Sequence, residues 1–179
     1  MESCPTSKPY TWCTEAPLPA RTSSVSTLMT NMHLIASTIM LTTVLGDLNI
    51  ALTTYAYCED CEVHSGFFDA MSEVKEYVLQ NVQALLATYE PTYKVVVTGH
   101  SLGAALATLT SVELVYNNIT ASNGVILMNF GSPRVGNKKF AVYASKLLVH
   151  RYRVTHHKDI VPHLPWYPYY QHISGWYLI

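Results

Sequence analysis

The sequence predicts an α/β fold in which a mostly parallel sheet is flanked by helices. From residue 65 onward, short runs of β-branched and apolar residues alternate with longer segments of helical periodicity. Glycine- and serine-rich turns follow the predicted strands. Almost half of the 179 residues are apolar (49%), which is enough for a sizeable core, and this length favours one domain.

The N-terminal part is less regular than the rest. Residues 1–27 are rich in Pro, Ser and Thr, and we expect them to be irregular. Residues 28–57 remain ambiguous between helix and strand. The first clear element is a helix after residue 65, because apolar side chains recur every three or four positions until Pro91 ends the pattern. These side chains are Phe68, Met71, Val74, Val78, Val82 and Leu85.

A strand near residues 93–97 and a helix over 102–116 follow. Three valines at 95–97 form an apolar run without alternation, which predicts a buried parallel strand. The helix is rich in Ala and Leu. Gly-His-Ser-Leu-Gly at 99–103 joins them and puts Ser101 at the apex of a sharp turn. The alternative is an ordinary strand–helix turn in which this hydroxyl caps the helix.

The remaining elements repeat the alternation. They are a strand at 125–130, a turn at 131–137, a helix at 138–148 and a third strand at 152–156. Strands that alternate with helices imply a parallel sheet with right-handed crossovers. In such a sheet, reactive groups gather at the carboxyl ends of the strands, and Ser101 follows one such end.

A serine nucleophile needs a base, and the base needs an orienting acid. Asp159 follows the third strand and is the favoured acid; its alternative role is a turn residue that caps backbone amides or pairs with Lys158. Glu113 lies within the helix after the nucleophile and is a poorer choice. His172 is the favoured base because a long loop precedes it, whereas His163 is only four residues from Asp159.

An oxyanion formed at Ser101 needs two hydrogen-bond donors. The backbone N–H of Leu102, at the start of the helix, is the first. The second has to come from a loop after an earlier strand, and the residues alone do not identify it.

The four cysteines and a glycosylation sequon at 118–120 favour an oxidising compartment and secretion. We predict a local disulfide between Cys58 and Cys61. A redox-active pair is an alternative, as is zinc binding with His64, although four ligands at suitable spacing are not apparent.

Charge excludes one class of partner. The net charge is −1 and no basic run occurs, so nucleic-acid binding is not expected. Residues 22–46 carry no formal charge, which favours a buried segment over a membrane anchor because Ser and Thr interrupt the apolar stretch. Four aromatic residues precede His172 and either line an acyl or aryl pocket or pack to hold the histidine loop; they are Trp166, Tyr167, Tyr169 and Tyr170.

Four segments in a fixed order, at 58–67, 97–103, 131–137 and 156–165, resemble the fungal-type class 3 lipases, an α/β-hydrolase family that includes triacylglycerol lipases and a feruloyl esterase. The resemblance covers roughly residues 47–179 and implies a lipase-like domain over 28–179. It implies Ser101 as nucleophile, Asp159 as acid and His172 as base, with no metal and no organic cofactor. The implied partner is a lipid or ester substrate at a lipid–water interface; the oligomeric state is not indicated.

The sequence also departs from this family. Family members carry an Arg-Gly-Ser or Arg-Gly-Thr stretch whose hydroxyl residue supplies the second oxyanion donor, and no Arg-Gly pair occurs here. Counting back from Asp47-Leu48-Asn49 puts Thr38 near that position. We expect the fold to be N-terminally truncated relative to the family. The hypotheses are a secreted triacylglycerol lipase, weakened by an incomplete oxyanion hole, a feruloyl-type esterase, or a catalytically impaired lipase-like binding protein.

Overall fold

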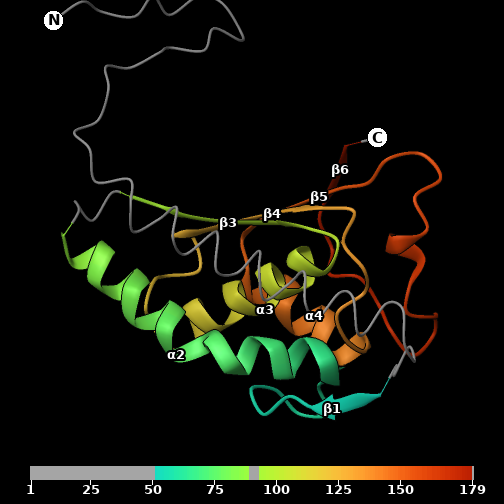
Figure 1. Cartoon of the computed structure of the whole chain (residues 1–179), viewed down its shortest axis with the longest axis horizontal. Helices are drawn as coiled ribbons and strands as arrows, with labels where there is room; N and C mark the ends of the chain where they lie inside the picture. The colour runs from blue at the N-terminus through green and yellow to red at the C-terminus, as the bar shows by residue number, and fades with distance from the viewer. Residues whose placement is uncertain (1–50, 89–92, 179) are drawn as a thin grey trace, which may run out of the picture.

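The computed structural model describes residues 51–88 and 93–178 (Figure 1). The earlier predictions for residues 1–27, for 28–50 and for Thr38 lie outside these residues. The elements, in chain order, are β1 (Leu52–Thr54), β2 (Glu62–His64), α2 (Ser65–Thr88), β3 (Val95–His100), α3 (Leu102–Tyr116), β4 (Val125–Phe130), α4 (Lys138–Leu147), β5 (His150–Val154), a 3₁₀ helix η1 (Val161–His163) and β6 (Trp176–Leu178).

The main sheet has the strand order β3-β4-β5-β6, and all its neighbouring strands are parallel. In its register, His100 lies beside Phe130, Phe130 beside Val154, and Val154 beside Leu178. The carboxyl ends of the four strands are therefore level. The loops that leave them meet along one edge, as the sequence predicted for a parallel sheet.

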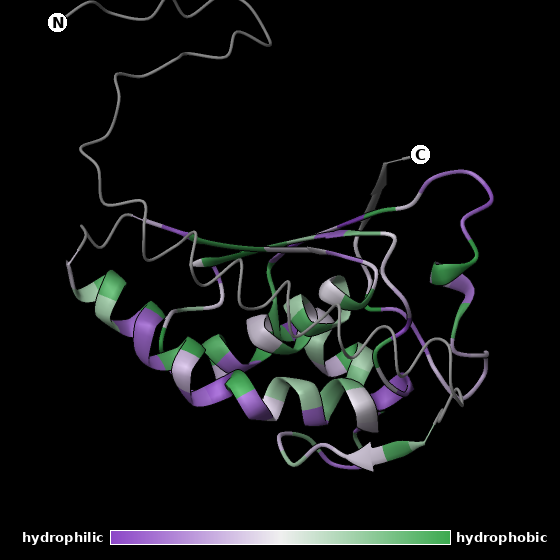
Figure 2. Ribbon diagram, in the orientation of Figure 1, coloured by the Kyte–Doolittle hydropathy of each residue, from purple (hydrophilic) through white to green (hydrophobic). Residues whose placement is uncertain are grey.

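The three helices α2, α3 and α4 lie together on one side of this sheet (Figure 1). α3 is the central one, because it packs on β3 and β4 and also against α2. Residues 104–115 of α3 are all buried, as expected for a helix that is apolar around its whole circumference. α2 is amphipathic, and its hydrophilic and hydrophobic residues alternate along the outer layer in Figure 2.

The apolar stripe predicted for α2 is only partly correct. Met71 and Val78 are buried, whereas Phe68, Val74 and Val82 are half-buried at the edge of the core. Buried positions also fall one residue before or after the predicted ones, because α2 packs against both α3 and the hairpin of β1 and β2. The stripe is therefore wider than a single row.

The prediction that residues 95–97 form a fully buried strand is wrong in one respect. β3 is parallel, but its side chains alternate in exposure and Val96 is 57% exposed. The physical reason is that α3 covers only one face of β3. A continuous apolar run predicts burial on both faces, and among the described elements no helix contacts the other face.

Element boundaries follow local chemistry. α3 begins and ends where predicted, and α4 ends one residue earlier than predicted. The side chain of Asn137 accepts a hydrogen bond from Phe140 N at 2.9 Å and so caps the start of α4. Leu148 is already extended, which lets β5 begin at His150, two residues before the predicted strand.

β1 and β2 form an antiparallel hairpin closed by a disulfide between Cys58 and Cys61. The predicted local disulfide is confirmed. Tyr55 N donates to Cys61 O at 2.7 Å, which holds the turn together. Because both sulfurs are in the bond, the zinc alternative with His64 is wrong. Within residues 51–88 and 93–178, no helix is long and apolar enough to cross a membrane.

Candidate active site

Ser101 stands between β3 and α3 in a strained backbone conformation. Its φ is 54° and its ψ is −124°, a region that non-glycine residues seldom occupy. Such strain costs about 1–3 kcal/mol and is found mainly at functional sites. Its N–H donates to Phe130 O at 3.0 Å, which ties the turn to the end of β4.

The serine hydroxyl is not a helix cap. Ser101 makes no side-chain hydrogen bond to the first turn of α3, so the capping alternative is wrong. The sharp turn also requires a glycine at position 99, because a Cβ there would lie 2.2 Å from Gly103 O. Strand and helix approach each other too closely for any side chain at that point.

The first turn of α3 leaves donors available beside the serine. The N–H groups of Ala104 and Ala105 donate to Ser101 O at 3.0 and 3.4 Å. Those of Leu102 and Gly103 have no hydrogen-bond acceptor in the described part of the chain. An N–H at a helix start, in the positive end of the helix dipole, suits a developing oxyanion. Leu102 is thus free to take the predicted donor role.

Asp159 lies in the loop after β5 and uses its two oxygens differently. Oδ1 accepts a hydrogen bond from Val161 N at 3.0 Å, which is the turn-capping role that the sequence left open. Oδ2 faces Gly131, where an added Cβ would lie 2.9 Å away. Gly131 has a φ of +54° and follows β4 directly, so the second oxygen points to the sheet edge where Ser101 also lies.

His172 is held on the backbone of η1. Its Nε2 lies 2.7 Å from Pro162 O. Burial, the positive charge of Arg153 and that of Arg134 lower the pKa of His172 to about 4, although the Pro162 carbonyl opposes the shift. The imidazole is therefore neutral at pH 7, which is the state that a general base requires.

Asp159 and His172 line one hollow of about 240 Å³ on the loops after β4 and β5. Ser101 does not line it. The nine lining residues are Arg134, Arg153, Thr155, His156, His157, Asp159, Pro162, His163 and His172.

No hydrogen bond joins Ser101, Asp159 and His172 to one another in this structure, all three being among the described residues. A carbonyl only accepts, so Nε2 carries the hydrogen in its contact with Pro162 and Nδ1 keeps the lone pair. For Nε2 to receive the proton of Ser101, the ring has to leave Pro162. Unbound enzymes often hold such groups apart until substrate binds. His163, the rejected base, is exposed on η1.

Arg134 holds the loop between the predicted acid and base. Its Nη1 donates to His163 O and, at 2.7 Å, to Pro165 O, while its backbone N donates to Leu164 O at 2.8 Å. Sequence reasoning missed both this role and the charge of Arg153 beside His172. The signal for Arg134 was its place in the Gly-Ser-Pro-Arg turn that follows β4.

The aromatic residues before His172 divide into two groups. Tyr170 is buried, and its hydroxyl donates to Ala51 O at 3.3 Å, which agrees with the packing interpretation. Trp166, Tyr167 and Tyr169 are exposed, which does not fit the packing interpretation, and they do not line this hollow.

Comparison with known proteins decides the family. The family model described as lipase (class 3) matches residues 32–168. This chain belongs to the class 3 lipase family. The resemblance seen in the sequence is confirmed, and with it the α/β fold and a place among lipase-family ester hydrolases.

Among the relatives of this chain, "Secreted mono- and diacylglycerol lipase 1" of Fusarium solani is 44% identical over 105 residues, which is 59% of this chain and 30% of that protein. A lipase of Rhizomucor miehei is 37% identical over 122 residues, 68% of this chain and 33% of that protein. The structure of Rhizomucor miehei triacylglyceride lipase superposes with a TM-score of 0.70 and 33% identity, over 78% of this chain and 52% of that one. The chain thus spans about a third of these curated relatives and about half of the solved chain.

The roles of Ser101, Asp159, His172 and Leu102 in this member of the family stay predictions, as does the second oxyanion donor. Across residues 51–88 and 93–178, no cluster of three or more His, Cys, Asp or Glu side chains could hold a metal ion.

Proposed function

We propose that this protein is a serine esterase that hydrolyses acylglycerols, with Ser101 as nucleophile, His172 as general base and Asp159 as the orienting acid. The observation that carries the proposal is the strained turn at Ser101, whose hydroxyl is free of any capping role at the carboxyl end of a parallel strand. Membership of the class 3 lipases and the names of the relatives support the substrate class.

In the first half of the reaction, His172 takes the proton of Ser101 as Oγ attacks the ester carbonyl carbon. The carbonyl oxygen becomes an oxyanion and accepts a hydrogen bond from Leu102 N–H. The tetrahedral intermediate then collapses. Its C–O bond to the alcohol breaks, the alcohol receives the proton from His172, and the acyl group stays on Ser101.

In the second half, a water molecule gives one proton to His172 and attacks the acyl carbon. The bond to Ser101 breaks, the proton returns to Oγ, and a fatty acid leaves. Asp159 keeps the imidazole in the required orientation and stabilises its charged form, which counters the two nearby arginines that lower the pKa of His172.

A fluorophosphonate probe tests the nucleophile. We expect one labelled serine, Ser101, in folded protein and no label in Ser101→Ala. The matched control is Ser72→Ala, which removes an exposed serine of α2 and should label like the wild type. Folded wild-type protein that takes up no label contradicts the proposal.

Three alternatives differ in the preferred substrate, in the catalytic rate, or in having no catalysis at all. A feruloyl-type esterase would hydrolyse ethyl ferulate faster than trioctanoin, and we expect the reverse order. A weakened enzyme lacking one oxyanion donor loses about 10²–10³ in rate. Such an enzyme would turn over p-nitrophenyl butyrate but leave trioctanoin almost untouched. A binding protein without catalysis would give no difference between wild type and Ser101→Ala.

We also propose that the protein works outside the cell. The disulfide between Cys58 and Cys61 suits an oxidising compartment, and the Fusarium solani relative is named as secreted. Culture medium that contains the disulfide-bonded protein, as seen by thiol alkylation and mass spectrometry, is the expected result. Retention of the reduced protein inside the cell contradicts it.

A further inference from the structure

The sequence carries one glycosylation sequon, and it lies in the loop between α3 and β4. Asn118-Ile119-Thr120 is the only Asn-X-Ser or Asn-X-Thr triplet in the chain. Such a triplet can hold an N-linked oligosaccharide in a folded protein when its asparagine lies on the surface. Asn118 is exposed and comes directly after the end of α3. The proposed ester chemistry uses none of these three residues.

Asn118 ends α3 through its backbone and not through its side chain. Its φ is 55°, a left-handed conformation in which asparagine is enriched. Its N–H donates to Val115 O at 3.1 Å, and Ile119 N donates to Leu114 O at 3.0 Å, a pattern that closes many helices. Within residues 51–88 and 93–178, the side chain of Asn118 makes no hydrogen bond. A sugar on its Nδ2 therefore leaves this helix end intact.

Asn117, the preceding residue, uses its side-chain amide for the fold. Its Nδ2 donates to Glu113 O at 2.9 Å and to Glu113 Oε2 at 3.0 Å. A sugar at this position would break both bonds to a buried carboxylate, and no Ser or Thr follows two residues later. Of the two adjacent asparagines, Asn118 alone combines the triplet with an uncommitted amide.

The other two residues of the triplet fix the loop. Ile119 is partly buried and packs against the core. Thr120 Oγ1 faces Gly124, where a new Cβ would lie 2.2 Å from that hydroxyl. Gly124 O accepts a hydrogen bond from Val95 N at 2.8 Å, which joins the loop to β3. Asn118 is therefore held on the outside of an anchored loop.

This loop lies at the edge of the sheet opposite to the proposed catalytic residues. It leads into β4 at Val125, which pairs with Val95 at the amino ends of the two strands. Ser101 lies at the other end of α3, a helix of 15 residues that spans about 22 Å at 1.5 Å per residue. A glycan on Asn118 would leave the carboxyl edge of the sheet open to substrate.

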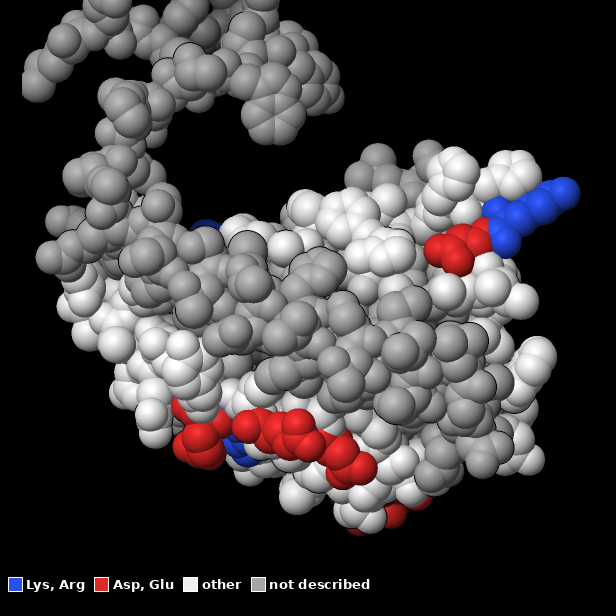
Figure 3. Space-filling view, in the orientation of Figure 1, with Lys and Arg blue, Asp and Glu red and all other residues white. Residues whose placement is uncertain are grey.

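The loop also contains no charged side chain. Residues 117–124 include no Asp, Glu, Lys or Arg. The exposed acids nearby in sequence belong to α2, and Figure 3 shows them as red atoms where Figure 1 draws this helix; they are Asp69, Glu73 and Glu76. A neutral oligosaccharide would therefore displace no charged group of this loop and would add hydrated surface to it.

We propose that Asn118 carries an N-linked oligosaccharide that stands clear of the edge where substrate would bind. In the transfer, Nδ2 attacks the anomeric carbon of an oligosaccharide linked to a lipid diphosphate. A bond forms between Nδ2 and this carbon, the bond from the carbon to the diphosphate oxygen breaks, and Nδ2 loses one proton. The proposal rests on the proposed export of the protein and not on its esterase activity.

The site is tested with the full chain, expressed in yeast behind a removable secretion signal so that it enters the secretory pathway. Peptide-N-glycosidase in heavy-oxygen water converts a glycosylated asparagine into a labelled aspartate, which peptide mass spectrometry locates. We expect one label, at position 118. Protein retained in the membrane fraction is digested in the same way, because the transfer precedes folding. An unlabelled position 118 in both fractions overturns the proposal.

Two aspartate variants provide the matched comparison. Asn118→Asp keeps the size of the side chain but has no amide nitrogen, so the glycan should be lost completely. Asn123→Asp makes the same charge change at an exposed asparagine of the same loop that is not in a triplet, and it should stay glycosylated. Thr120→Ser preserves the triplet and should also keep the glycan. A glycan that persists in Asn118→Asp, or that is lost in both aspartate variants, contradicts the assignment.

Activity separates this proposal from the proposed function. The glycosylated wild type and Asn118→Asp should hydrolyse dissolved p-nitrophenyl acetate within two-fold of each other, because the loop is far from Ser101. A difference of ten-fold or more overturns the placement of the glycan. A glycosylated protein that hydrolyses no ester contradicts the proposed function alone, and an active protein with an unmodified Asn118 contradicts the glycan alone.

Discussion

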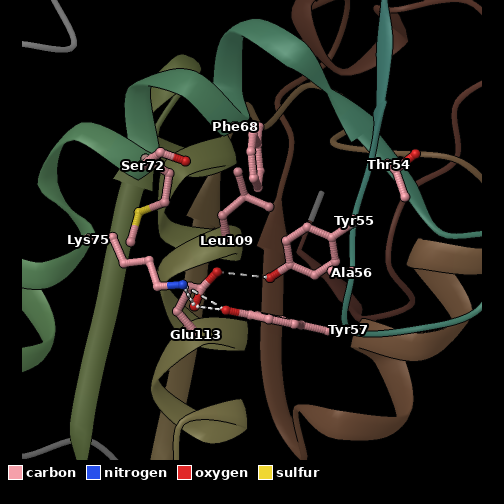
Figure 4. Close-up of a pocket in the computed structure, with 10 residues that line it drawn as sticks. Thr54, Tyr55, Ala56, Tyr57, Phe68, Ser72, Lys75, Leu109 and Glu113 are labelled. Atoms are coloured by element: carbon pink, nitrogen blue, oxygen red, sulfur yellow. Dashed lines mark hydrogen bonds and ion pairs between the residues drawn. The ribbon is translucent and has the colours of Figure 1, made fainter.

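The polar side chains at the two ends of α3 differ in how many hydrogen bonds they make. At the N-terminal end, Ser101 is strained and its hydroxyl makes no capping bond. Twelve residues further along, roughly 18 Å at 1.5 Å per residue, Glu113 is only 3% exposed and lies at the centre of a bonded cluster. Figure 4 shows this second region, where Glu113 faces Lys75, Tyr55 and Tyr57.

The Glu113 cluster satisfies its buried charge. Lys75 forms an ion pair with Glu113 Oε2 at 3.0 Å, Tyr57 OH donates to the same oxygen at 2.7 Å, and Asn117 Nδ2 donates to it at 3.0 Å. Tyr55 OH reaches Oε1 at 3.4 Å. Burial, reinforced by the charge of Glu113, raises the pKa of Tyr55 well above its usual range, so this hydroxyl keeps its proton.

The contrast distinguishes a residue that stabilises the fold, Glu113, from one that is available for a reaction, Ser101. A buried charge that has all its partners stabilises the fold and has no capacity left to act on a substrate. A strained residue with an uncommitted hydroxyl costs stability and keeps its reactivity. Glu113 was set aside as the catalytic acid because it lies within a helix, and its commitments to α2 and the hairpin give that choice a physical reason.

The largest expected effect comes from Ser101. Ser101→Ala should lower kcat for p-nitrophenyl butyrate by at least about 10⁴-fold, because no other group replaces the nucleophile. Ser101→Gly should be equally inactive but about 1 kcal/mol more stable in urea unfolding, since glycine accepts a positive φ. A gain in stability for alanine equal to that for glycine contradicts the strain argument.

The turn itself is tested with its two glycines. In Gly99→Ala, the new Cβ meets Gly103 O and has to push β3 and α3 apart, so we expect a loss of about 4 kcal/mol or more in free energy of unfolding. Gly103→Ala is the control, because a Cβ there meets nothing within 4 Å. It should be neutral or up to about 1 kcal/mol more stable, through helix propensity. Equal effects in the two variants exclude the steric explanation.

The Glu113 cluster should affect stability and not chemistry. Glu113→Ala leaves the Lys75 ammonium without its ion-pair partner and the hydroxyls of Tyr55 and Tyr57 without their acceptor, so the free energy of unfolding should fall by about 3 kcal/mol. kcat of the folded fraction should stay within a few-fold of wild type. Glu76→Ala, an exposed acid on α2, is the matched control and should change little. A large fall in kcat for folded Glu113→Ala contradicts the separation of the two ends.

The last expected effect concerns the pH dependence of stability. The pKa of His172, about 4 in the fold, lies below its ordinary 6.5, so the unfolded chain binds more protons between these values. The free energy of unfolding should therefore fall by about 3 kcal/mol as pH drops from 7 to 4, and stay level above 7. Burial also lowers the pKa of His64, which adds a slope of the same sign. His172→Gln should flatten the profile; an unchanged slope means that His172 is not the source.

The sequence predicted the fold well where one physical rule acts alone. A segment rich in Ala and Leu after Ser101 predicts α3, and its observed bounds match. The rule that a continuous apolar run is buried on both faces failed at Val96. Such a run does not show which face of the strand a helix will cover. The sequence also did not predict the start of β5. Leu148 fits the helical pattern in the sequence, but its backbone is already extended.

The candidate site was predictable by residue type but not by environment. Ser101, Asp159 and His172 follow from the order of nucleophile, acid and base along the chain. The charge of Arg153 beside His172, and the carbonyl of Pro162 that holds its ring, come from loops that meet only after folding. No local pattern encodes such a meeting, so the low pKa of His172 could not be foreseen.

During translation, the turn at Ser101 is synthesised before Asp159 and His172, because it comes earlier in the chain. The level edge of the sheet brings these three loops together only when β3, β4 and β5 have paired. Until then the growing chain carries a serine with neither of its proposed partners. Parallel pairing between distant strands is a late event in folding. The proposed nucleophile, acid and base therefore reach the same edge of the sheet only after all three strands are in place.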